Sequence, residues 1–197
     1  TGVDVAPGDE PVLIDAVDDK PEDWSEEKTK NETDKIKTRT KKTIEEKLGD
    51  DPYAKQVFSA LLKDAIEKAE SMFDYKAQFK LFSDLEAMVE DRDVPDLPTD
   101  RFEGNKHAQA YYGAFKLVLG DEFAALESEK GEQLIQEAFE IDQVVNRAVA
   151  ENSLNPVGIE QDVRKSLLPR LFALIGLDKA KAMLDEVVQI LRNGVAR

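Results

Sequence analysis

The chain has 197 residues, 41% of them hydrophobic and 35% charged, so it is long enough to bury one substantial core or two small ones. It contains no cysteine, which excludes disulfides, cysteine-ligated zinc and a cysteine nucleophile, and favours a cytoplasmic location. The formal net charge of −15 argues against a free-standing nucleic-acid-binding domain, and no apolar run is long enough to predict a membrane contact or span.

This charge is unevenly distributed. Residues 1–24 carry a net charge of −7 and residues 49–140 carry −11, whereas residues 25–48 carry +2 and residues 141–197 carry +1. The C-terminal segment is therefore the large part of the chain that is least hindered from approaching an acidic partner surface.

Residues 1–24 combine acidic residues with prolines and glycines, and only Val12 to Ile14 favour a short strand. Such a segment buries too little apolar surface to offset its ordering entropy, so we expect an irregular acidic leader. The start at Thr1, without a methionine, indicates a piece of a longer polypeptide. The leader is then expected to act as a linker from a preceding domain.

Residues 25–92 are predicted to form a long helix followed by a helical hairpin. Ser25 before two glutamates marks the first start and Gly49 the stop, but the apolar face between them is thin. This helix contains five cations that form a candidate phosphate or DNA contact: Lys35, Lys37, Arg39, Lys41 and Lys42. A solvated helix face is the alternative, because no aromatic residue lies between them to stack on bases.

The hairpin is predicted from a denser apolar pattern. Asp51 and Pro52 mark its start, and a break near Asp74 separates two helices that should pack antiparallel. The apolar stripe expected on the first of them is Val57, Phe58, Leu61, Leu62, Ala65, Ile66, Ala69, Met72 and Phe73.

Residues 93–106, rich in proline and acidic residues, are expected to be a linker to a C-terminal helical bundle over residues 107–197. In this bundle a helix ends at Gly120, a short helix precedes a break at Gly131, and a longer helix includes residues 134–148. The tyrosines of the first helix, Tyr111 and Tyr112, are expected at the core edge with hydroxyls in solvent.

Two further helices complete the predicted bundle. Asn155 and Pro156 mark the start of one, which Gly176 closes, and Asp178 is expected to cap the last. Pro169 should kink or split the helix that contains it. Four cations of these helices are candidate partner contacts, with solvated surface as the alternative: Arg164, Lys165, Arg170 and Arg192. The fold class is therefore all-α, with about seven helices and an acidic, irregular leader.

Motifs that would support catalysis are scarce. The sequence has no P-loop and no dinucleotide-binding fingerprint, so we expect no catalytic, cofactor-binding or metal-binding residue in this segment. Asp15 with Asp18, Asp19 and Lys20 is the apparent magnesium-nuclease candidate, but no rigid sheet supports these residues, and an acidic linker is the favoured interpretation. The single histidine, His107, is expected to pack or cap.

Three stretches resemble one protein family. They are DDPYAKQVFSALLKDAI at residues 50–66, HAQAYYGAFKLVLG at residues 107–120, and the C-terminal run containing NPVGIE, LLPRLF and GLDKA within residues 151–190. Together they resemble the C-terminal helical region of the restriction, or motor, subunit of type I restriction-modification enzymes. The resemblance extends from about Ser25 to the C-terminus.

The resemblance implies an assembly role for this segment. In that family the whole subunit uses ATP and magnesium to translocate and cleave DNA, while this helical part joins the motor to a core of methyltransferase and specificity subunits. The implied partners are that core, the motor domains of the same subunit, and DNA through the complex. Two alternatives remain: a stand-alone helical adaptor unrelated to restriction, and a magnesium nuclease built on the acidic leader.

Overall fold

The computed structural model describes residues 20–152 and 154–195, and all regular secondary structure in these residues is helical. The expectation of an all-α fold is confirmed. No helix in this part of the chain is long and apolar enough to cross a membrane. The helices are α1 (Glu26–Lys47), α2 (Pro52–Glu70), α3 (Tyr75–Asp91), α4 (Lys106–Leu119), α5 (Phe123–Glu151), α6 (Pro156–Ile175) and α7 (Leu177–Val195), with short 3-10 helices at Pro21–Asp23, Thr99–Phe102 and Gly120–Glu122.

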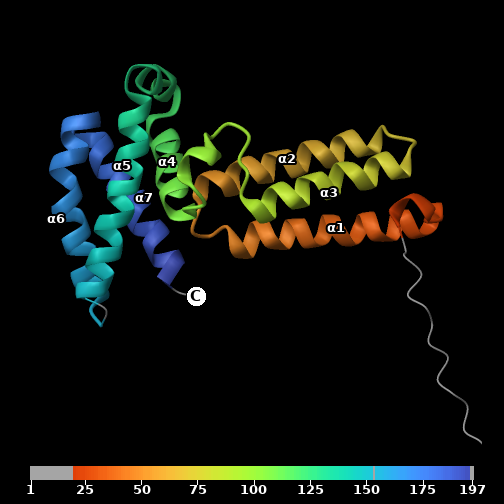
Figure 1. Cartoon of the computed structure of the whole chain (residues 1–197), viewed down its shortest axis with the longest axis horizontal. Coiled ribbons are helices and arrows are strands. Elements are labelled where there is room, and N and C mark those ends of the chain that lie inside the picture. Colours follow the sequence, from red (N-terminus) through yellow and green to blue (C-terminus); the bar gives the residue numbers. More distant parts are fainter. Residues whose placement is uncertain (1–19, 153, 196–197) are drawn as a thin grey trace, which may run out of the picture.

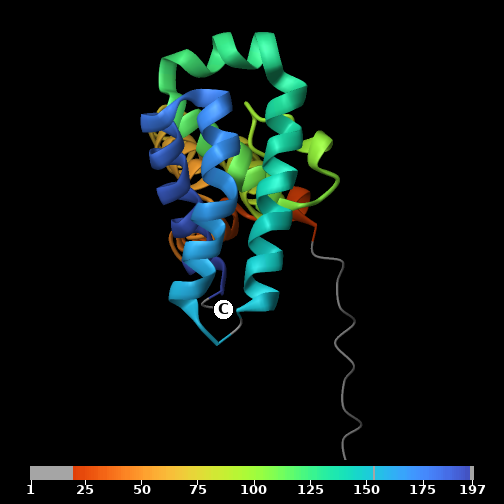
Figure 2. The same ribbon diagram turned by 90° about the vertical axis from the view of Figure 1, so that its left-hand side faces the viewer.

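The molecule is elongated and consists of an arm and a bundle (Figure 1). The arm comprises α1, α2 and α3, which run along the long axis, with α1 packed mainly against α3. The bundle comprises α4 to α7, of which α5, α6 and α7 cross the direction of the arm steeply. Seen from the bundle end, α6 lies in front with α5 and α7 on either side (Figure 2). The contact of α2 with α4 joins the two parts.

Helix α1 packs through a face made largely of threonines. Ile36 and Ile44 are its buried aliphatic residues, and the rest of its buried face is formed by Thr29, Thr33 and Thr40. Their spacing of three or four residues places them on one helical stripe. The hydroxyls of Thr29 and Thr33 donate to backbone oxygens one turn earlier, at 2.9 and 2.7 Å, so they enter the interface with their polar groups satisfied. The thin apolar face thus packs against α3.

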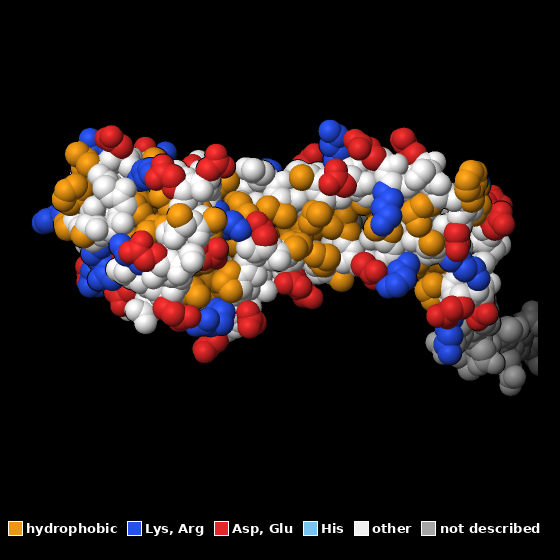
Figure 3. Space-filling model, turned by 90° about the horizontal axis from the view of Figure 1, so that it is seen from above, with side chains coloured by type: hydrophobic (Ala, Val, Ile, Leu, Met, Phe, Trp, Pro, Cys, Tyr) orange, Lys and Arg blue, Asp and Glu red, His pale blue; other side chains and the backbone are white. Residues whose placement is uncertain are grey.

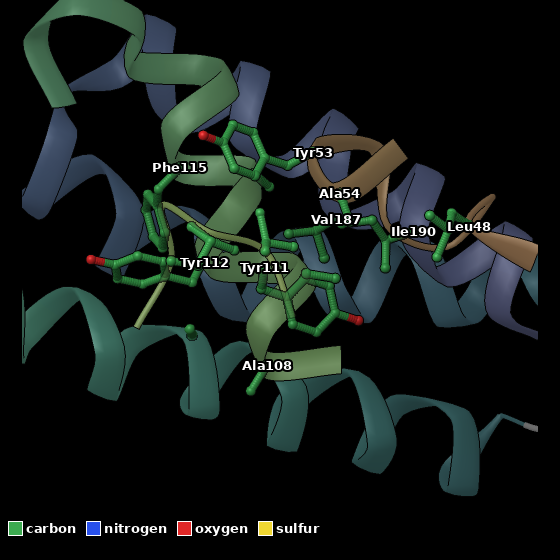
Figure 4. Packing of buried hydrophobic residues seen from close by; sticks show 14 of the residues in the cluster. Leu48, Tyr53, Ala54, Ala108, Tyr111, Tyr112, Phe115, Val187 and Ile190 are labelled. Carbon is green, nitrogen blue, oxygen red and sulfur yellow. The ribbon is translucent and has the colours of Figure 1, made fainter. Parts of the chain in front are cut away.

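Helix α4 is the centre of the fold. Its residues 108–115 are all buried, because α2, α5 and α7 each cover part of its surface. Figure 4 shows Tyr111, Tyr112 and Phe115 of α4 together with Ala54 of α2 and Val187 of α7. The expectation that the tyrosine hydroxyls reach solvent is wrong: Tyr111 is 2% exposed, and Tyr112 donates to Glu127 at 2.6 Å. A helix that is apolar all round is typical of a core element.

The segment between α3 and α4 is folded and anchored. Its apolar residues Val94, Leu97 and Phe102 are buried in the same core as the helices on both sides. It leaves α3 through Arg92, which has a left-handed backbone with φ of 51° and ends the helix. The segment predicted as a linker is therefore a packed connection between arm and bundle.

Most predicted helix ends are where the capping residues place them. The side chains of Ser25, Asp51 and Asn155 accept hydrogen bonds from the first turns of α1, α2 and α6. One boundary differs: helix α7 begins at Leu177, so Asp178 lies in its first turn. The predicted break at Gly131 has a counterpart one residue earlier, because Lys130 within α5 has a non-helical backbone, with φ of −136° and ψ of 27°, and the helix is kinked there.

Two apolar residues predicted to face the core of the hairpin are exposed. Ile66 is 41% exposed and Phe73, in the turn between α2 and α3, is 98% exposed. Helix α2 has more apolar residues than its contacts with α3, α1 and α4 can cover, and it ends before Phe73.

Helix α6 continues through Pro169 and is not split there. Pro169 is exposed, so its ring does not disturb the packed side of the helix. Because proline has no N–H, Pro169 cannot donate the helical hydrogen bond to the carbonyl oxygen of Lys165, four residues earlier.

We expect Pro169→Ala to raise the free energy of unfolding by about 1 to 2 kcal/mol, since alanine restores the missing helical bond and suits a helix interior better. The gain is reduced because proline also restricts the unfolded chain. Urea unfolding of both proteins checks this prediction. A matched change in the same exposed region, Ala173→Ser, should lower stability slightly, and an unchanged or lower stability of Pro169→Ala would show that α6 depends on the proline.

Candidate functional site

The basic stretch of α1 is paired with carboxylates of the arm. Four of its lysines lie near acids three or four residues away on the same helix, at 2.6 Å for Lys35, 3.3 Å for Lys37 and 3.9 Å for both Lys41 and Lys42. Arg39 instead reaches α3, where Glu86 accepts two hydrogen bonds at 2.8 and 2.9 Å. Exposed pairs of this kind contribute little to stability. The positive charge of this stretch is therefore largely neutralised by nearby carboxylates. Its contact with DNA stays a prediction.

Three of the four predicted partner-contact cations tie the bundle helices together. Arg164 donates from α6 to Asp185 of α7 at 2.7 Å, and Arg192 returns from α7 to Glu160 of α6 in a two-bond contact. Arg170 donates two hydrogen bonds of 2.9 Å from α6 to Glu137 of α5. The Glu137 side chain is only 9% exposed, so this pair is the best shielded of the three.

Lys165 differs from these three arginines. It is exposed, and no carboxylate in the part of the chain that the structure describes lies within ion-pair distance of it. Lys165 lies on the side of α6 that is turned away from the bundle. The exposed residues of that side recur at steps of four, four and seven, and we name them the outer face of α6: Val157, Gln161, Lys165 and Phe172.

The outer face of α6 is unusually apolar for a surface. Val157 is 64% exposed and Phe172 is 55% exposed, while Leu168 between them is half-buried. Hydrophobic side chains gather at the end of the molecule where α6 lies (Figure 3). The sequence does contain the signal for this face, because α6 has apolar residues in two opposite phases. The other phase, Ile159, Val163, Leu167 and Leu171, is buried in the bundle.

A second polar site lies at the junction of arm and bundle, around the turn between α1 and α2. The Arg92 guanidinium donates to Asp50 at 2.8 Å and to the backbone oxygen of Lys47 at 3.2 Å. From the bundle, Gln109 donates to the backbone oxygen of Arg92 and Asn193 donates to that of Gly49, both at 2.7 Å. These bonds hold the ends of α1, α3, α4 and α7 around one turn.

Asp51 is the most deeply buried acid of this junction. Its side chain caps α2 by accepting from the Ala54 N–H at 3.0 Å, while its other carboxylate oxygen is buried without a hydrogen-bond partner among the described residues. Burial raises the pKa of Asp51 to about 6, and the cap bond and Arg92 only partly oppose this rise. The ionised carboxylate of Asp51 therefore lowers the stability of the folded chain relative to its protonated form.

A third cluster joins the arm to the bundle through side chains. The Tyr53 hydroxyl of α2 donates to Asp96, and Lys116 of α4 donates to the same carboxylate at 2.7 Å. Partial burial acts to raise the pKa of Asp96, but the bonds from Lys116 and Tyr53 outweigh it and hold that pKa below its ordinary value. The cluster positions Tyr53 firmly against α4.

The arm also carries a shallow groove between α1 and α2, with a volume of about 370 Å³. Ile44, Leu62 and the exposed Ile66 form its apolar floor. Its rim has charges of both signs, and Lys41 and Lys63 each pair with a glutamate of their own helix. No charge of one sign dominates the groove.

The remaining sequence candidates form no reactive arrangement. His107 is half exposed, with Nδ1 3.8 Å from a carboxylate oxygen of Asp142. Residues 20–152 and 154–195 contain no group of three or more histidine or acidic side chains placed to hold a metal. Asp15, Asp18, Asp19 and the expected strand at Val12 to Ile14 lie outside the described residues, and Lys20 alone of the magnesium candidate lies within them.

Comparison with protein-family models, with curated proteins and with solved structures finds no match to this chain. The geometry of the surface and the sequence resemblance are therefore the grounds for assigning a function. The described part of the chain offers helix-to-helix ion pairs, a buried polar junction and one apolar outer face. Of these three features, an exposed apolar face is the one typical of interaction surfaces.

Proposed function

We propose that this chain is a C-terminal helical assembly domain of a type I restriction enzyme motor subunit. It holds the ATP-dependent DNA translocase and endonuclease on the core of methyltransferase and specificity subunits, and it performs no chemistry itself. ATP and magnesium act in the nuclease and motor domains of the whole subunit. DNA reaches this domain through the complex, and the five cations between Lys35 and Lys42 remain its candidate contact.

The observation that carries this proposal is the location of the resembling stretches. They correspond to the start of α2, to α4, and to α6 with α7; α4 packs against α2 and α7, and α7 packs against α6. A family-like sequence at mutually packed positions supports a shared fold, because substitutions there are constrained by volume. The geometry adds rigidity, since ion pairs link α6 to both of its neighbours.

A binding measurement tests the proposal. The purified chain is mixed with the methyltransferase–specificity core of the same restriction system, and the complex is followed by size-exclusion chromatography and by titration calorimetry. We expect co-elution and a Kd in the micromolar range or tighter, typical of a standard interface. No binding at about 100 μM of each component, with the chain shown to be folded by circular dichroism, would overturn the proposal.

The second candidate is a stand-alone helical adaptor, favoured by the exposed outer face of α6, which any partner with a complementary surface could use. The same titration separates the two functions. An adaptor unrelated to restriction has no affinity for the methyltransferase–specificity core, whereas the assembly domain does.

A further inference from the structure

We propose that the outer face of α6 is the docking surface of this chain, and that its occupant is an apolar helix of the methyltransferase–specificity core carrying a carboxylate that pairs with Lys165. This inference rests on the proposed function and adds to it the face that docks and the chemistry of its partner.

The first argument is the concentration of exposed apolar side chains. Of the six large hydrophobic residues found exposed in the described chain, four lie on α6 or in the turns beside it: Leu154, Val157, Phe172 and Leu177. Single exposed hydrophobic residues are ordinary, but several on one surface mark an interaction site. Because Val157 and Phe172 are four helical turns apart on the same face, a helix or other extended element is the shape that covers both.

The second argument is the charge of the face. The arginines beside it are already paired within the bundle, Arg164 with Asp185 and Arg170 with Glu137, whereas Lys165 has no such carboxylate among the described residues. Burying an unpaired ammonium under a purely apolar partner is unfavourable, so a stable partner must supply an acid opposite Lys165. The partner is therefore apolar with a single negative charge near its centre.

The same charge argues against a second copy of this chain as the occupant. The apolar stripe extends from Val157 to Phe172, so Lys165 lies close to its midpoint. In a two-fold dimer through this stripe, whether the helices run parallel or antiparallel, Lys165 would face Lys165 of the other copy. Like charges opposed in this way disfavour the contact.

The test is calorimetric titration of the methyltransferase–specificity core with variants of the full chain. We expect Phe172→Asp and Lys165→Glu each to weaken binding at least about tenfold, equivalent to about 1.4 kcal/mol. The controls, Phe73→Asp at the tip of the arm and Lys63→Glu on α2, change an exposed aromatic residue and an exposed lysine far from α6 and should bind like the wild type. Circular dichroism and thermal unfolding check that every variant is folded; Lys165 is fully on the surface, so its variant is expected to fold.

The outcomes separate this inference from the function on which it rests. If the wild type binds and both α6 variants bind equally well, the assembly function stands and the docking face is overturned. The same conclusion follows if the controls lose binding as much as the α6 variants do. Absence of wild-type binding overturns both. Light scattering of the chain alone provides the last measurement. If the chain is a dimer and Phe172→Asp makes it monomeric, the face binds a second copy and the proposed partner is rejected.

Discussion

Replacing Gly113 with alanine is expected to lower the free energy of unfolding by about 2 to 3 kcal/mol. A Cβ atom at Gly113 of α4 would lie 2.8 Å from the Cβ of Tyr53 and 3.2 Å from its ring, closer than real contacts allow. Tyr53 cannot retreat easily, because it is 8% exposed and its hydroxyl is bonded to Asp96. The substitution therefore forces apart α2 and α4, the pair that joins arm and bundle.

Gly131→Ala is the matched control for this prediction. Its Cβ would meet only a side-chain carbon of Glu127 at 3.8 Å, an ordinary contact, and alanine suits a helix better than glycine. We expect a gain of about 0.5 kcal/mol in urea unfolding, against the loss at Gly113. If the two substitutions had the same sign and size, the close approach of α2 and α4 would not be the cause.

Replacing Asp51 with asparagine is expected to stabilise the protein in a pH-dependent way. Asparagine keeps the cap of α2, because its side-chain oxygen also accepts from the Ala54 N–H, but it removes the buried charge. At pH 7 we expect the free energy of unfolding to rise by about 1 to 2 kcal/mol relative to the wild type, because removal of the buried charge outweighs the cost of an amide NH2 group placed where the second oxygen of Asp51 has no partner.

The direction with pH follows from the raised pKa of Asp51, about 6 in the folded chain against an ordinary value of 3.8. Between these values the folded chain binds more protons than the unfolded chain, so this residue makes the wild type less stable as the pH rises from about 4 to about 6. The advantage of Asp51→Asn should therefore be small at pH 4 and complete at pH 7.

Urea unfolding at several pH values measures this advantage. Asp74→Asn is the control, because Asp74 caps α3 in the same way but is exposed. An advantage of Asp51→Asn that is equal at pH 4 and pH 7 would show that burial of the carboxylate is not its source.

Local signals in the sequence were sufficient for the helices and for much of the core. Caps such as Asn155 before Pro156 act through bonds to the next turn, so they do not depend on the rest of the fold. The apolar residues of α7 recur at helical spacing and are buried, because one face of that helix meets the bundle: Ala180, Met183, Leu184, Val187, Val188 and Leu191.

Features that depend on how one helix packs against another could not be predicted from the sequence. Thr33 is a polar residue, so the sequence does not predict that it is buried. The structure shows that its hydroxyl donates to a backbone oxygen of the preceding turn, which allows it to pack against α3. Phe172 and Leu171 are adjacent and both apolar, yet one is 55% exposed and the other fully buried, since the position of α5 and α7 decides which side is covered. The exposed stripe, and with it the candidate site, therefore required the tertiary structure.

The arm has a mechanical consequence for a protein proposed to hold a motor. Helix α2, 19 residues long, extends about 28 Å from Tyr53 in the core to the turn that carries Phe73. Packed against α1 and α3 it is stiff, so a load applied at the tip reaches the bundle as a torque on the short α2–α4 contact. Two features oppose this torque: the close packing of α2 on α4 at Gly113, and the hydrogen bonds made by Arg92 and to the backbone of Gly49.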